Sequence, residues 1–95
     1  GHMLELGEYS QRLHEMVGRE VVKNKIDILI TVGKLSKSIA DIALKNGMEE
    51  KNIFMCNNND EAASLINQKA NNGDAILLKA SNSLNFQEIF NLIYV

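Results

Sequence analysis

The sequence has little cysteine, no large excess of charge of one sign and no long apolar run. Cys56 is the only cysteine among 95 residues. This excludes an intrachain disulfide framework and a cysteine-rich zinc site, and it is typical of a protein of the reducing cytoplasm. Ten basic residues against twelve acidic ones, a net charge of −2, argue against a nucleic-acid or anionic-membrane surface. The longest apolar stretch, residues 28–32, is too short to span a bilayer.

Several motifs that carry catalytic chemistry are also missing. The sequence has no G-x-x-x-x-G-K-[ST] loop and no G-x-G-x-x-G turn, which excludes nucleotide binding in the P-loop or dinucleotide manner. Histidines and carboxylates nowhere have metal-ligand spacing, and there is no nucleophile elbow. We therefore predict a binding role without catalytic residues, without a metal site and without a cofactor held by this chain.

The length sets the domain organisation. A chain of 95 residues leaves room for one domain only. Residues 1–3, Gly-His-Met, are typical of the remnant of a cleaved affinity tag, and we assign residues 4–95 to a single domain.

Hydrophobic periodicity predicts an alternation of helices and strands. Helical spacing of apolar residues predicts helices at 10–24, 35–45, 61–70 and 86–93, and short apolar runs predict strands at 26–32, 52–56 and 75–79. Ser10 is expected to cap the first helix, and Asn46-Gly47 to end the second. Inward residues are expected in the first helix at Leu13, Met16, Val17, Val21 and Val22, and in the last at Phe86, Ile89, Phe90 and Ile93.

Strands separated by helices predict crossover connections and a parallel sheet. The fold class is therefore α/β, a three-layer αβα arrangement with a Rossmann-like sheet. Three strands for four helices, and an opening on a helix, indicate a truncated domain. Truncation would leave an unpaired parallel sheet edge, which predicts a homodimer formed through that edge.

Ligands of open parallel sheets bind at the carboxyl ends of the strands, beside helix N-termini. This geometry selects the loops at 5–10, 33–36, 57–60 and 79–83. The candidate binding residues are Gly33, Lys34, Ser36, Lys79, Ser81 and Asn82.

Each candidate also has a structural interpretation. Lys79 could be a solvated lysine, Ser36 could cap its helix, and Ser81 and Asn82 could belong to a cap-rich turn. His14 is interpreted as a packing or capping residue of the first helix rather than an acid-base catalyst. Cys56, with no basic neighbour in sequence, is interpreted as a core thiol.

Three segments resemble the C-terminal domain of the Mur ligases. Residues 4–10 (LELGEYS), followed by Leu13-His14 and Val17-Gly18, are similar to the signature in the middle of that domain. Residues 27–36 (DILITVGKLS) resemble its next strand and loop, and residues 73–79 (GDAILLK) its Gly-Asp strand. The similarity is greatest to the MurF type, which joins D-alanyl-D-alanine to UDP-N-acetylmuramoyl-tripeptide (UDP-MurNAc-tripeptide).

One motif departs from the family pattern. The family's Lys-Gly-Ser-Arg reads Lys79-Ala80-Ser81-Asn82 here, and asparagine cannot replace the bidentate contact of arginine with a carboxylate. Either the substrate is held in another way, or the motif is structural in this branch.

The resemblance implies a part in ATP-dependent amide formation in peptidoglycan biosynthesis. In the parent enzyme, ATP and magnesium act on another domain, and this domain positions the incoming dipeptide, so the chain alone is expected to be inactive. The loops at 33–36 and 79–82 would face the dipeptide, with Lys34 or Lys79 meeting its carboxylate. The resemblance also covers Glu5, Gly7, Glu8, Ser10 and His14, without assigning them a role.

Two other functions stay open. The chain could be a free-standing flavodoxin-like or receiver-like module that binds a small anion or a protein, although the acidic pair of a receiver is missing. It could also be a ligase remnant retained for protein interaction, which the altered motif at 79–82 favours.

Overall fold

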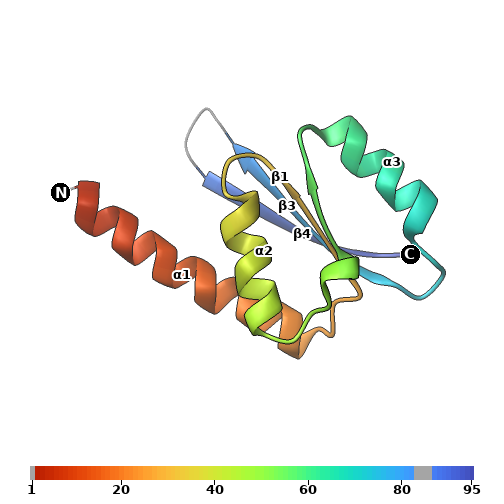
Figure 1. Ribbon diagram of the computed structural model, residues 1–95, viewed down its shortest axis with the longest axis horizontal. Helices are drawn as coiled ribbons and strands as arrows, with labels where there is room; N and C mark the ends of the chain where they lie inside the picture. The colour runs from red at the N-terminus through yellow and green to blue at the C-terminus, as the bar shows by residue number, and fades with distance from the viewer. Residues whose placement is uncertain (1, 83–86) are drawn as a thin grey trace.

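The computed structural model describes residues 2–82 and 87–95, and the side chains of residues 11–80 and 90–95. Its elements in chain order are α1 (His2–Lys23), β1 (Ile28–Val32), α2 (Ser36–Lys45), the 3-10 turn η1 (Glu50–Asn52), β2 (Ile53–Cys56), α3 (Asn59–Lys69), β3 (Ala75–Asn82) and β4 (Gln87–Tyr94) (Figure 1).

The four strands form one mixed sheet in the order β2-β1-β3-β4. The central strand β1 is parallel to both β2 and β3, whereas β4 is antiparallel to β3. Helices α1 and α2 lie on one face and α3 lies on the other (Figure 1). The α/β class and the three-layer arrangement are confirmed, while the prediction of three strands, all parallel, with four helices is wrong.

The last element differs most from expectation. The helix predicted over 86–93 is instead the strand β4, which pairs with β3 from Gln87 to Tyr94; Phe86 lies outside the described residues. The spacing of Ile89, Phe90 and Ile93 fits a helical period, but Leu92 and Tyr94 add apolar residues between those positions. A short segment that is apolar on both faces is compatible with either period, and pairing with β3 decides in favour of the strand.

The N-terminal segment also differs. Helix α1 begins at His2, so the loop predicted at 5–10 is wrong, and Ser10 lies inside the helix rather than capping it. No proline or β-branched run interrupts residues 2–10, and the helix therefore continues through them. None of the helices formed by residues 2–82 combines the length and apolar content of a membrane-spanning segment.

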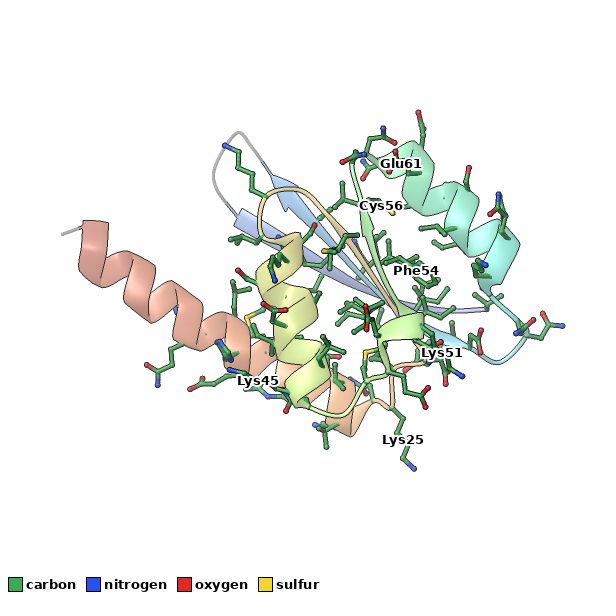
Figure 2. All side chains as sticks on the ribbon, in the orientation of Figure 1. Lys25, Lys45, Lys51, Phe54, Cys56 and Glu61 are labelled. Carbon is green, nitrogen blue, oxygen red and sulfur yellow. The ribbon has the colours of Figure 1, made fainter. Side chains whose placement is uncertain are left out.

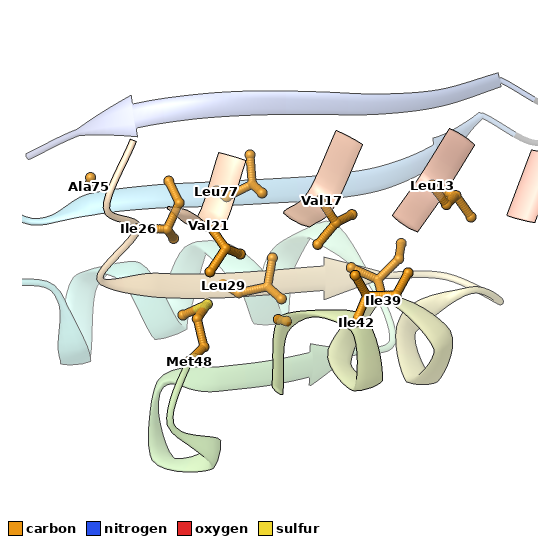
Figure 3. Close-up of a cluster of buried hydrophobic side chains, with 11 residues drawn as sticks. Leu13, Val17, Val21, Ile26, Leu29, Ile39, Ile42, Met48, Ala75 and Leu77 are labelled. Atoms are coloured by element: carbon orange, nitrogen blue, oxygen red, sulfur yellow. The ribbon is translucent and has the colours of Figure 1, made fainter. Parts of the chain in front are cut away.

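The larger apolar core lies between the sheet and the layer of α1 and α2. Leu13, Val17 and Val21 project from α1 toward Leu29 and Leu77 of the sheet (Figure 3). The predicted inward positions Met16 and Val22 are wrong, because they are 39% and 62% exposed. A helix that meets the core along one narrow stripe buries every fourth residue and leaves the flanking positions in water.

A second core lies under α3. Ile28, Ile30 and Ile76 are buried there, together with Cys56 and Ala62. Successive residues of β1 thus enter opposite cores, which explains why its sequence is almost continuously apolar.

The predicted end of α2 is confirmed at Asn46-Gly47. Gly47 has a φ of 102°, and its N–H donates to the carbonyl of Leu44, while the N–H of Met48 donates to that of Ala43. These two bonds form a Schellman motif, in which glycine adopts the left-handed conformation without strain. The motif turns the chain toward β2.

Candidate functional site

The carboxyl edge of the sheet is defined by three paired residues. Val32 of β1 is opposite Cys56 of β2 and Ala80 of β3 in the two parallel ladders. The chain passes from β1 into α2 and from β2 into α3 at this edge, so the loops predicted at 33–36 and 57–60 do lie together. This arrangement is the usual position of a ligand site in an open α/β sheet.

A tight turn connects β1 to α2. Gly33 has a φ of 111°, and its carbonyl accepts bonds from the Ser36 hydroxyl (2.8 Å) and the Ser36 N–H (3.3 Å). Ser36 is buried, and the residue at the cap position is Leu35. The hydroxyl therefore closes the turn and does not cap the helix, while Lys34 is exposed beside it.

Lys79 lies in β3 and not in a loop. Its side chain is fully buried, so the interpretation as a solvated lysine is wrong. Pairing with β4 extends β3 to Asn82, and this extension keeps Lys79 inside the ladder. Burial lowers the pKa of Lys79 from its usual 10.5 to about 8, because the charged ammonium loses hydration.

Thr31 is the neighbour of Lys79 across the ladder, and sequence reasoning missed it. The two residues are direct partners in the β1–β3 register, and they lie on the same face as Leu29 and Leu77. Thr31 is fully buried, and its Oγ1 has no hydrogen-bond partner among the residues that the structure describes. The one available signal was a threonine within an otherwise apolar strand.

The rest of the altered motif continues the strand. Ser81 and Asn82 are opposite Glu88 and Gln87 in the β3–β4 ladder, so the predicted cap-rich turn is wrong at these two positions. Their side chains, and Ser83, lie outside the described residues.

The asparagines after β2 have structural roles. The side chain of Asn58 accepts a bond from the Glu61 N–H (2.9 Å), and the Glu61 carboxylate accepts one from the Asn57 N–H (2.8 Å). Together they cap α3. An open hollow of about 480 Å³ lies beside them, lined by Met55, Cys56, Asn58, Asp60, Glu61, Ser64 and Leu65.

Cys56 is one of the residues that line this hollow. Its burial confirms the interpretation as a core thiol. It is buried and free. Burial raises the pKa of the Cys56 thiol, and the negative charge of Glu61, which lies close to it in Figure 2, raises it further. A thiol with a raised pKa is a poor nucleophile.

The residues of the family signature lie in α1, and the side chains described among them form no polar cluster with the sheet. Glu5, Gly7, Glu8 and Ser10 lie in the first turns of the helix, and their side chains are outside the described set. His14 is exposed, so its interpretation as a packing residue is wrong. Gly18 is buried, and a Cβ built on it would lie 3.1 Å from the side-chain oxygen of Asn46. Gly18 therefore permits the close approach of α1 to the end of α2.

Two further motif residues lie at the opposite, amino edge of the sheet. The Asp27 N–H donates to the Ala75 carbonyl, and the Asp27 carboxylate accepts from the Ala75 N–H, both at 2.8 Å. The Asp74 carboxylate accepts a bond from the Asn71 N–H in the preceding turn. Asp27 and Asp74 thus fix the start of β3, a structural role that the sequence pattern did not reveal.

Within residues 2–82 and 87–95, no group of three histidine, cysteine or carboxylate side chains has the arrangement of a metal site. The carboxyl edge offers hydrogen bonding and charge of both signs, with Lys34 at the surface, Lys79 beneath it, and Asp60 and Glu61 at the start of α3.

The chain matches a known protein family and a known enzyme. Residues 1–82 match the family described as "Mur ligase, glutamate ligase domain". The chain is also 35% identical over 89 residues to UDP-N-acetylmuramoyl-tripeptide–D-alanyl-D-alanine ligase of Bacillus subtilis (strain 168). That alignment covers 94% of this chain but only 19% of the relative, so the chain spans about a fifth of the relative's length. No solved structure matches the chain.

Proposed function

This chain belongs to the Mur ligase family, and from that premise we propose that it positions the incoming D-alanyl-D-alanine in a ligase that extends UDP-N-acetylmuramoyl-tripeptide. The observation that carries the proposal is the 35% identity, over 94% of the chain, to a ligase with that name. The fold agrees with a positioning role, because the carboxyl edge offers hydrogen-bonding and charged groups, among them Lys34 and Lys79.

The dipeptide carboxylate would meet the turn at Gly33–Ser36. Lys34 is exposed there, and the first N–H groups of α2 add partial positive charge. Lys79, buried beneath the same edge, adds to the potential that attracts an anion without touching it. With asparagine in place of the family's arginine at position 82, Lys34 is the exposed cation that we assign to the carboxylate.

The contribution of this chain to the reaction is orientation of the amine and exclusion of water. In the whole enzyme, ATP and magnesium supply the activation of the substrate carboxylate. We place them outside this domain, as the resemblance to the Mur ligases implies. The chain alone is accordingly expected to form no amide bond, and its parent to act in the cytoplasm.

A domain exchange tests the proposal. The segment of the Bacillus subtilis ligase that aligns with this chain is replaced by it, and the ATP-dependent joining of D-alanyl-D-alanine to UDP-N-acetylmuramoyl-tripeptide is measured. We expect activity, and Lys34→Ala in the chimera should raise the KM for the dipeptide severalfold while leaving the KM for the UDP-tripeptide unchanged. An unchanged KM for the dipeptide would refute the assignment of Lys34.

A titration of the isolated, 15N-labelled chain provides the second test. D-Alanyl-D-alanine should shift the amide signals of Gly33, Lys34 and Ser36, and L-alanyl-L-alanine at the same concentration should shift them less. Shifts confined to the amino edge, around Asp27 and Asp74, would contradict the proposed site. Equal shifts with both dipeptides would contradict its specificity.

A further inference from the structure

The two edges of the sheet differ in how they are protected. At one edge, β2 has only four residues, and a short edge strand offers little for another chain to pair with. At the other edge, β4 has eight residues and pairs with β3 alone. One row of its N–H and C=O groups is therefore turned away from the sheet along the whole strand.

Strand β4 lacks the devices that usually protect an edge. Glu88, near its start, is the one charged residue of β4, and residues 89–95 (IFNLIYV) contain no proline and no charged residue, whereas monomeric proteins place lysine, proline or a bulge at such positions. Beyond the last pair of the ladder, Ala75 with Tyr94, Val95 still forms backbone bonds with Gly73 and Asp74. Tyr94 and Val95 are 67% and 44% exposed. From residue 89 onward the edge is thus mainly apolar and is bonded to β3 along its length.

We propose that β4 pairs with β4 of a second copy of this chain, so that two sheets join into one of eight strands. The pair is antiparallel about a two-fold axis normal to the sheet, and it centres on Asn91. In this register Asn91 is opposite Asn91 of the second copy, and Phe90 is opposite Leu92 of the second copy.

The side-chain pattern of β4 selects this register. Phe90 and Leu92 lie on the face of α1 and α2, next to the larger core, and the pairing places apolar residue opposite apolar residue there. On the other face Asn91 is exposed and Ile93 is half-buried. A register displaced by two residues in either direction would place Asn91 opposite an isoleucine, Ile89 or Ile93. Cross-strand pairs of matched polarity stabilise a sheet.

Helix α1 packs over one face of β4, where Phe90 and Leu92 contact the larger core, but α2 and α3 leave the outer edge of β4 uncovered. Helices α2 and α3 pack on β1 and β2, at the far side of the sheet from β4 (Figure 1). The partner must be an extended segment of high β propensity that carries little charge, and residues 89–94 of β4 are themselves such a segment. A two-fold pairing also closes on itself, so the assembly stops at the dimer.

Sedimentation equilibrium over a range of concentrations, with Asn91→Lys, tests the proposal. The wild-type chain should dimerise, and Asn91→Lys, which places two ammonium groups at the axis, should weaken dimerisation at least tenfold without changing the circular dichroism. Asn67→Lys is the matched control, because Asn67 is exposed on α3, and it should dimerise as the wild type does. A wild-type monomer at every concentration, an unaffected Asn91→Lys dimer, or a series of larger species would overturn the proposal.

Disulfide trapping tests the register even if Asn91→Lys fails to fold. Asn91→Cys should give a covalent dimer on mild oxidation, since directly opposed residues of an antiparallel pair have Cβ atoms about 4.5–5.5 Å apart. Met55→Cys places an exposed thiol on β2 and should not cross-link. The buried Cys56 is present in both variants. Cross-linking that favours Met55→Cys would assign the interface to the β2 edge and refute the proposal.

Discussion

Thr31 and Lys79 are direct partners in the parallel β1–β3 ladder, and both are fully buried beneath the carboxyl edge of the sheet. A buried ammonium group is unusual in a core, and so is a hydroxyl, that of Thr31, which finds no hydrogen-bond partner among the described residues, because buried polar groups carry a desolvation cost. Both residues lie beneath the edge where we propose that the substrate binds, so a role in binding would explain why these polar groups are buried there. The pair supplies positive charge and polarity at a depth that no loop residue reaches.

The low pKa of Lys79 makes the stability of the domain depend on pH. Burial lowers the pKa of Lys79 to about 8 in the folded state, against 10.5 for an ordinary lysine. Between these two values the unfolded chain binds more protons than the folded one, so the free energy of unfolding rises with pH. We expect the difference in free energy of unfolding between wild type and Lys79→Met to rise by roughly 2–3 kcal/mol from pH 7 to pH 10.

Urea unfolding at a series of pH values measures this difference directly. Subtracting the variant removes the contribution of all other groups that titrate in the same range. Lys34→Met is the matched control, since Lys34 is exposed, and its difference from wild type should be flat. A flat difference for Lys79→Met as well would show that Lys79 titrates as an ordinary lysine.

Elements whose local signals agree could be predicted from the sequence. The run 28–32 (ILITV) is β-branched and apolar, and it is the central strand β1. Asn46-Gly47 ends α2 as predicted, and Asn58, also a residue of cap type, begins α3. In these places a single local preference, for a buried strand or for a helix end, is enough to define the structure.

The remaining elements depend on contacts that are distant in sequence. Residues 87–94 follow a helical spacing as well as a strand spacing, and the bonds to β3 decide between them. The burial of Lys79 follows from the same pairing, because β4 extends β3 beyond the expected end at residue 79. The loops at 33–36 and 57–60 were therefore placed correctly at the carboxyl ends of the strands, but the depth of Lys79 and its pairing with Thr31 could not be predicted.

Asp27 should be important for stability although it is exposed. Its carboxylate accepts the N–H of Ala75 at 2.8 Å, and Ala75 is buried. Asp27→Ala would leave that N–H without its acceptor, which costs about 1–3 kcal/mol in free energy of unfolding. Asp27→Asn retains an acceptor oxygen and should lose less.

Asp41→Ala is the control for this measurement. Asp41 forms a solvent-exposed ion pair with Lys37 at 3.4 Å, and such pairs contribute at most about 1 kcal/mol. If urea unfolding gave Asp27→Ala and Asp41→Ala the same small loss, the bond from Ala75 to Asp27 would not stabilise the start of β3.

Gly18 should be coupled to Asn46. A Cβ at position 18 would lie 3.1 Å from the side-chain oxygen of Asn46, whose amide donates to the Ile42 carbonyl. Gly18→Ala gains about 1 kcal/mol in helix propensity, but it displaces the Asn46 side chain and loses a hydrogen bond of about the same value. We expect Gly18→Ala to be nearly neutral in the wild type and to stabilise by about 1 kcal/mol in an Asn46→Ala background. Additive changes in this double-mutant cycle would mean that the two residues do not constrain each other.

Cys56 should be protected from thiol reagents while the chain is folded. Burial is the larger cause of its raised pKa, and the charge of Glu61 is the smaller, so both access and thiolate concentration are low at neutral pH. At pH 8 the reaction with a disulfide reagent should be at least tenfold slower than in urea, when the release of thiol product is followed by absorbance. Glu61→Gln should accelerate the native reaction only severalfold, because it removes the negative charge but leaves the thiol buried. Equal rates in folded and unfolded protein would show that the hollow between β2 and α3 admits the reagent freely and that Cys56 is not a core thiol.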